Sequence, residues 1–147
     1  MIPALELLSD VRLTSLYALR PDQADSLEAY AQMLDFAFLR ADLIEEIGQT
    51  EQLEKIGQDL KFPSWYGANL DALHDCLTDL SWQSARGYIL LIQGIEEVLT
   101  SPETESLRDV LTSVIEFWQA QETPFWVFFE TSNPSANTHL QKIEMWK

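Results

Sequence analysis

Two uninterrupted apolar runs constrain the fold of this chain more than any other feature of its sequence. Residues 88–92 read Tyr-Ile-Leu-Leu-Ile, and residues 125–129 read Phe-Trp-Val-Phe-Phe. Neither run alternates between apolar and polar positions, as a strand with one solvated face would. Continuous apolar runs of this length are typical of parallel β-strands that are covered on both faces of the sheet. We therefore expect both runs to form parallel strands.

The segments around these runs alternate between helical and strand patterns. A long amphipathic helix is predicted between the runs, because Ser101-Pro102-Glu103 is a favourable helix start and apolar residues follow at helical spacing, namely Leu107, Val110, Leu111, Val114 and Trp118. Earlier in the chain the pattern predicts a strand at 13–19, a helix at 21–34, a strand at 36–41, and a helix capped by Thr50 with Leu53, Ile56 and Leu60 on its inner face. This succession predicts an α/β fold with a small, mainly parallel sheet of three to four strands packed with helices.

The segment 62–80 combines an aromatic–glycine turn with a short amphipathic helix. The apolar stripe of that helix consists of Leu70, Leu73, Leu77 and Leu80, and its polar stripe consists of Asp71, His74, Asp75 and Thr78. Asn69 is a favourable N-cap. One side of the helix is therefore suited to pack on a core, while the other side presents carboxylates, with no Lys or Arg between Lys61 and Arg86.

The acidic side of this helix has a functional and a purely structural interpretation. Asp71 would complement the helix dipole in the first turn, so structure alone can explain it. Asp75 and Asp79 lie beyond that turn, and like charges four residues apart cost roughly 0.2–0.5 kcal/mol per pair, a repulsion that a cationic partner would relieve. Trp65 and Tyr66 precede the helix, and aromatics of this kind serve as anchors in protein interfaces. The residues alone leave open whether this face binds a partner or is only solvated.

The overall charge narrows the classes of partner. The chain has 9 basic and 24 acidic residues, which gives a net charge of −15. Such a surface repels phosphate, so direct binding to nucleic acid or to an anionic membrane is disfavoured. The expected partners are basic proteins, cationic ligands or metal ions. Asp71, His74 and Asp75 could in principle ligate a divalent metal, although no further ligand cluster lies near them in the sequence.

The sequence carries no signature of catalysis or of membrane insertion. It contains no G-x-S-x-G, Walker or G-x-G-x-x-G motif, so we expect neither an enzyme nor a cofactor. Cys76 is the only cysteine, and it falls beside the leucine stripe, where a small buried apolar residue is expected. The first residues lack the features of a signal peptide, and no segment approaches the ~18 apolar residues of a membrane helix. We therefore expect a soluble, cytoplasmic protein.

The segment from Trp65 to Thr78 resembles the signature of the barstar family of ribonuclease inhibitors. It reads Trp-Tyr-Gly-Ala-Asn-Leu-Asp-Ala-Leu-His-Asp-Cys-Leu-Thr, which is close to that family's pattern aromatic-Tyr-Gly-x-Asn-Leu-Asp-Ala-Leu-x-Asp-Cys-Leu. The predicted order of elements from about Phe36 to Phe129 also fits the small parallel sheet and packed helices of the family. The resemblance therefore implies a barstar-like α/β fold.

The resemblance also suggests how the chain is divided. We expect a single barstar-like domain over residues 1–147. Within it, residues 1–34 would be an N-terminal extension that adds a strand and a helix, and residues 35–130 the family-like core. Residues 131–147 would be a C-terminal tail that forms either an extra edge strand or a loosely held end.

In the barstar family, this loop and helix plug the active site of a secreted, basic ribonuclease, with carboxylates in the sites meant for RNA phosphates. The resemblance implies that Asp75 is the central anionic contact, Asp71 a second acidic contact, and Thr78 a polar contact one turn further on. Trp65 stands where a contacting tyrosine is found, His74 replaces a common aromatic, and Gly67 and Asn69 shape the loop. The nearest candidate for a further acidic contact, late in the helix before the last strand, is Glu116. The predicted partner-binding residues are therefore Trp65, Tyr66, Gly67, Asn69, Asp71, His74, Asp75, Thr78, Asp79 and Glu116.

Three functions follow from these observations. The first is an inhibitor that blocks the active site of a basic ribonuclease through the acidic helix and the aromatic loop before it. The alternative is a regulatory or immunity protein whose basic partner is not a ribonuclease. A third hypothesis is a metal-dependent enzyme that uses Asp71, His74 and Asp75.

Overall fold

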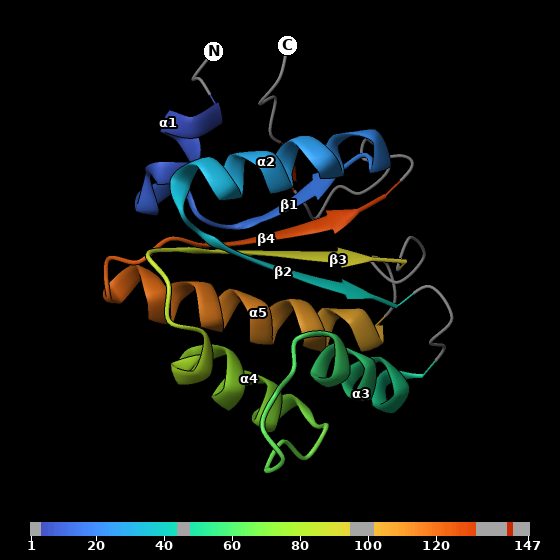
Figure 1. The fold of residues 1–147 in the computed structure, drawn as a ribbon. Coiled ribbons are helices and arrows are strands. Elements are labelled where there is room, and N and C mark those ends of the chain that lie inside the picture. The colour runs from blue at the N-terminus through green and yellow to red at the C-terminus, as the bar shows by residue number, and fades with distance from the viewer. Residues whose placement is uncertain (1–3, 44–47, 95–101, 132–140, 143–147) are drawn as a thin grey trace.

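The structure is a computed structural model that describes residues 4–43, 48–94, 102–131 and 141–142. Figure 1 shows its elements, which are, in chain order, α1 (Ala4–Ser9), β1 (Leu16–Leu19), α2 (Ala24–Leu34), β2 (Ala37–Asp42), α3 (Gln49–Asp59), α4 (Leu70–Asp79), β3 (Tyr88–Gln93), α5 (Pro102–Ala120), β4 (Phe125–Glu130) and β5 (Gln141–Lys142). Short 3-10 turns lie at Val11–Leu13, Pro21–Gln23 and Ser81–Gln83. None of the helices in the described ranges is long and apolar enough to span a membrane.

All strand pairs of the sheet are parallel, and the strand order is β2-β3-β4-β1-β5. The two apolar runs form the neighbouring strands β3 and β4, in a register that pairs Leu90 with Val127. The predicted α/β fold with a mainly parallel sheet is therefore confirmed. A fifth strand of two residues, β5, adds to the predicted three to four and pairs with β1 at the edge of the sheet.

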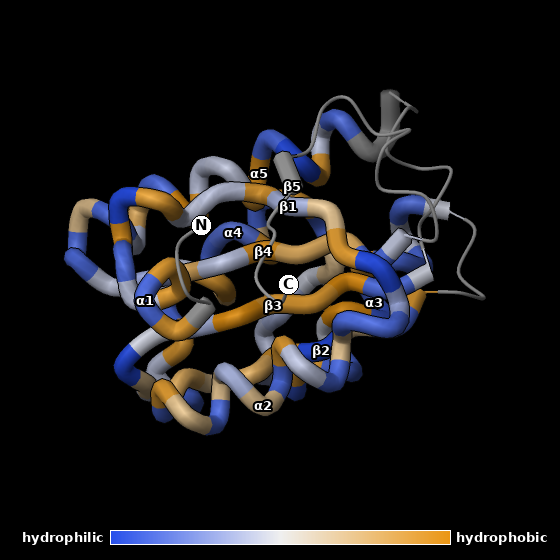
Figure 2. The backbone as a smooth tube through the Cα atoms, turned by 90° about the horizontal axis from the view of Figure 1, so that it is seen from above, coloured by the Kyte–Doolittle hydropathy of each residue, from blue (hydrophilic) through white to orange (hydrophobic). Residues whose placement is uncertain are grey.

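Helices cover both faces of the sheet, which explains why β3 and β4 are apolar throughout. Ile89 and Leu91 point toward α1 and α2, together with Trp126 and Phe128. The alternate residues of the same strands, such as Leu90, belong to the core formed with α3, α4 and α5. Figure 1 shows α1 and α2 on one side of the strands and α3, α4 and α5 on the other, and Figure 2 shows the hydrophobic stretch along β3.

Several predicted boundaries are wrong for local reasons. The strand predicted from residue 13 starts only at Leu16, because the Asp10 side chain accepts a hydrogen bond from the Arg12 amide and caps a 3-10 turn there. The helix predicted to be capped by Thr50 begins earlier, with Gly48 at the N-cap, since the Gln52 amide already donates to the Gly48 carbonyl at 3.0 Å. The predicted helix at 21–34 is divided into a 3-10 turn and α2.

Residues 4–35 contribute strand β1 to the sheet and helices that cover one of its faces. β1 pairs with β4 from Leu16 to Leu19, and β5 pairs with the other side of β1. α2 then crosses to β2 at the opposite edge, and its Leu27 and Ala31 are fully buried on the face formed by Trp126 and Phe128. This segment therefore covers apolar surface of β3 and β4 that α3, α4 and α5 do not reach.

Candidate functional site

Both ends of the acidic helix α4 are capped. The Asn69 side chain accepts a hydrogen bond from the Ala72 amide at 2.8 Å, as its N-cap role predicts. At the other end, Leu80 adopts the left-handed conformation, with φ of 48°, and its amide donates to the Cys76 carbonyl at 3.1 Å. The helix is therefore a short, capped unit whose faces are fixed by the ten residues between these caps.

The inner face of α4 is packed against α5. Leu73, Cys76 and Leu77 are buried, and Leu80 joins the same core. The indole Nε1 of Trp118 in α5 donates a hydrogen bond to the Leu77 carbonyl at 2.8 Å. Packing and this hydrogen bond together fix the rotation of α4, so that its aspartates turn away from the core.

The outer face of α4 carries Asp71, Asp75 and Asp79, all exposed. The side chain of Asp75 is 70% exposed, and Nδ1 of His74 lies 3.9 Å from its Oδ1. Within the described ranges, no Lys or Arg forms an ion pair with any of these three aspartates. Their charges therefore remain available to a cationic partner.

His74 and Thr78 lie on the side of α4 that faces α5. Nε2 of His74 is 3.2 Å from the Ser113 hydroxyl, which links the two helices. The Thr78 hydroxyl donates to the His74 carbonyl at 2.7 Å and keeps its lone pairs available as acceptors. Across the part of the chain that the structure describes, no three His, Cys, Asp or Glu side chains are grouped as a metal site requires.

The loop before α4 places its two central aromatics in opposite environments. Tyr66 is half-buried: its hydroxyl donates to the Leu53 carbonyl of α3 at 2.8 Å, and its ring packs edge-on against Phe62. Burial raises the pKa of Tyr66 well above its ordinary value, so it stays a neutral donor. Trp65 points outward and is 56% exposed. Tyr66 therefore positions the loop, while Trp65 is the residue that a partner can contact.

Two small residues allow this loop geometry. A Cβ added to Gly57 of α3 would lie 2.5 Å from the Tyr66 ring, so the glycine makes room for it. A Cβ on Gly67 would lie 3.1 Å from Nδ2 of Asn69, so this glycine allows a close approach of the Asn69 side chain, without a left-handed backbone of its own. Ala68 adopts the left-handed conformation, with φ of 52°, and no sequence signal indicates it, because glycine is the usual residue there.

Glu116 lies in α5, exposed, three residues after Ser113. Residues three apart share neighbouring positions on a helix, so Glu116 borders the side of α5 that faces His74. Two neighbours of Glu116 were not predicted from the sequence: Ser113, which links α5 to His74, and the exposed Phe117. A helical pattern marks buried positions, but it does not show which exposed residues of one helix border another.

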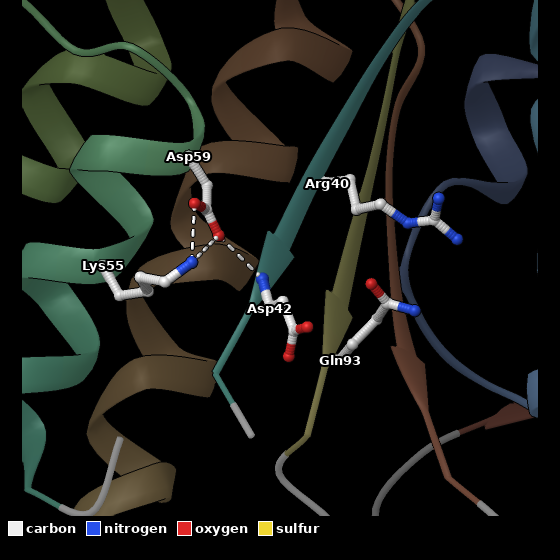
Figure 3. A pocket seen from close by; sticks show the side chains of 5 residues that line it. All are labelled: Arg40, Asp42, Lys55, Asp59 and Gln93. Carbon is white, nitrogen blue, oxygen red and sulfur yellow. Dashed lines mark hydrogen bonds and ion pairs between the residues drawn. The ribbon is translucent and has the colours of Figure 1, made fainter. Parts of the chain in front are cut away.

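A polar hollow of about 580 Å³ lies elsewhere, where β2 and β3 end (Figure 3), and it is lined by Arg40, Asp42, Lys55, Asp59 and Gln93. Lys55 pairs with Asp59 at 2.8 Å, and Asp59 also accepts from the Asp42 amide at 2.9 Å. Gln93 donates to Glu130 at 3.1 Å. Much of the polar capacity of this hollow is therefore used within the chain, and none of its residues was predicted as a site.

The fold and the site define a class of small, acidic α/β proteins with an exposed carboxylate-bearing helix. A family model described as Barstar (barnase inhibitor) matches residues 36–130, which include β2, β3, β4 and the whole acidic helix. The chain belongs to the barstar family, whose members are inhibitors of barnase-type ribonucleases and not enzymes. A search of curated proteins found no match to the chain.

Proposed function

We propose that this chain inhibits a basic ribonuclease by binding in its active site through α4 and the loop that precedes α4. The observation that carries this proposal is the placement of Asp75. Its side chain is 70% exposed and lies in the segment matched by the barstar family, on a helix whose other face is fixed to α5. Asp71 and Asp79 are exposed on the same helix.

Electrostatics supports this function at long and at short range. A net charge of −15 attracts a basic enzyme, and this attraction increases the rate of association with the enzyme at low salt. The same charge repels the RNA substrate of the enzyme. At contact, carboxylates that accept hydrogen bonds from Arg, Lys or His side chains form charge-assisted bonds, which are stronger than neutral ones. Asp71 and Asp75 would then occupy positions that substrate phosphates normally take.

The rigid setting of the site favours tight binding. α4 is capped at Asn69 and fixed to α5 through Trp118, and the loop is fixed to α3 through Tyr66. A surface that is already ordered loses little conformational entropy when it binds. Trp65 would add an apolar anchor beside the carboxylates. By this proposal the protein acts in the cytoplasm, without binding nucleic acid itself.

The test is the inhibition of a panel of basic ribonucleases, barnase included, at low and at high salt. Asp75→Ala should raise the dissociation rate by about 30-fold or more, since truncating one partner of a buried charged pair costs about 2–5 kcal/mol, a range to which the barstar–barnase complex itself contributes. The matched control is Asp25→Ala, which removes the same charge from an exposed position on α2, across the sheet. It should change only the association rate, and only slightly.

Equal effects of the two variants would show that only net charge matters and would contradict binding through α4. Capture of a single basic protein without nuclease activity would favour the alternative, a regulatory or immunity protein. Such a result would leave the acidic face as the binding site and change only the class of partner.

A further inference from the structure

The exposed aromatic side chains of the described ranges gather around α4. Trp65 lies before the helix and is 56% exposed, Trp82 lies after it and is 37% exposed, and Phe117 lies beside it on α5 and is 38% exposed. The other large exposed hydrophobic residues in these ranges, Leu5 and Met33, are aliphatic and belong to α1 and α2. The aromatic and the acidic side chains therefore share one region of the surface.

Phe117 is placed next to α4 by its neighbours along α5. It follows Ser113 by four residues, so both lie on the same side of α5, and Ser113 is within hydrogen-bond distance of His74 in α4. The next residue, Trp118, donates to the Leu77 carbonyl of α4. The Phe117 ring packs edge-on against the Trp118 ring, with centroids 5.3 Å apart. Its position relative to the acidic face is therefore fixed by tertiary contacts.

A partly exposed phenylalanine beside an acidic helix limits the kind of partner that can cover it. Interface cores are enriched in aromatic residues, because burying them removes a large apolar area from water. Phe117 stands next to the exposed Glu116, so a partner that covers this side of α5 meets an apolar ring and a carboxylate together. Such a partner must combine positive charge with an apolar patch.

We propose that Phe117 adds an apolar contact on α5, beside the acidic contact expected at Glu116, and docks on an apolar patch that borders the cationic cleft of the target ribonuclease. This proposal rests on the proposed function and adds an apolar contact to the electrostatic contacts that the aspartates of α4 would make. The occupant is the ribonuclease itself, because Phe117 lies on the side of α5 that Ser113 and His74 link to the acidic helix α4, whose charge is complementary to a basic enzyme. Phe117 thereby selects among basic ribonucleases that the acidic face alone would not distinguish.

The experiment measures association and dissociation of the full-length protein with barnase, and with any panel enzyme that it inhibits, at low and high salt. Phe117→Ala should dissociate roughly tenfold faster, as expected for an aromatic anchor, with unchanged association rate and salt dependence. Phe117→Leu should recover most of the affinity, since it keeps an apolar side chain. The control, Met33→Ala, truncates a residue that is 69% exposed on α2 and should bind like the wild type.

The possible outcomes separate the contact at Phe117 from the proposed function. If Asp75→Ala weakens binding while Phe117→Ala does not, the apolar contact at Phe117 is wrong and the proposed function stands. If Phe117→Ala and Phe117→Leu lose affinity equally and their thermal midpoints fall together, the ring is structural and the proposal fails. If the wild-type chain binds no enzyme of the panel, the proposed function and this inference fail together.

Discussion

Cys76 lies buried on α4 beneath two exposed carboxylates. Burial raises the pKa of the Cys76 thiol to about 11, and the negative charges of Asp75 and Asp79 act in the same direction, because they disfavour a thiolate nearby. The thiol therefore stays neutral and behaves as the small apolar residue predicted from the sequence. Charges on the acidic face thus help to keep a thiol in the core beneath them protonated.

The raised pKa of Cys76 predicts a pH dependence of stability. The unfolded chain loses this proton near pH 9, whereas the folded chain keeps it up to about pH 11. The unfolded state therefore binds fewer protons between these values, so the stabilisation that is complete below pH 9 is lost as pH rises. From pH 8 to 10.5 the wild type should lose about 1–2 kcal/mol more unfolding free energy than Cys76→Ala. Urea denaturation at both pH values measures the difference, and parallel losses in the two proteins would contradict it.

At the scale of elements, α4 illustrates how a short helix is held in place. Ten residues are too few for a stable isolated helix in water, so α4 depends on its caps and on packing. Asn69 supplies the N-terminal cap, and the leucine stripe with Trp118 supplies the packing. The spacing of the aspartates would have no functional meaning if this helix frayed.

The cap at Asn69 is open to a direct test. Asn69→Ala removes the acceptor for the Ala72 amide and should lower the unfolding free energy by about 1 kcal/mol, the typical cost of a lost N-cap. The matched control is Asn69→Ser, which keeps a capping oxygen and should lose only a fraction of that amount. Chemical denaturation of the three proteins gives the comparison. Equal stability of Asn69→Ala and the wild type would mean that packing alone holds the first turn.

At the scale of the whole molecule, we propose that the N-terminal extension and the family-matched region fold as one unit. β1 lies between β4 and β5, and α2 covers the sheet face that contains Ile89 and Trp126. Without these elements that face would be an exposed apolar surface on β3 and β4. The family match begins at residue 36, but the hydrophobic core contains residues from both sides of that position.

A substitution in α2 tests this unity. Leu27 is fully buried, and Leu27→Ala should lower the free energy of unfolding by about 2–5 kcal/mol through lost burial and a cavity. If the chain is one unit, hydrogen exchange in β3 should accelerate along with exchange in α2. The control is Met33→Ala on the same helix, which should stay within about 0.5 kcal/mol of the wild type. Faster exchange confined to α2 would show instead that the extension folds as a separate unit.

Most of the fold could be predicted from local sequence patterns, and the wrong predictions concern the ends of individual helices and strands. Apolar runs without alternation predicted β3 and β4, because a strand covered on both faces needs apolar residues at every position. The start of α3 was misplaced at Thr50, since good capping residues also occur inside first turns. The predicted start of α5 at Ser101 lies outside the described residues.

The sequence by itself determined the α/β class, the capped helix with one apolar and one acidic face, and the family. Each of these depends on residues close together in the chain, where helical or strand periodicity and capping act directly. Only the tertiary structure decided that Tyr66 turns inward to Leu53 while Trp65 turns outward, and that α5 packs against α4 through Trp118, the neighbour of the exposed Phe117. These placements depend on contacts between residues far apart in the chain, and only the packing of complete elements sets them.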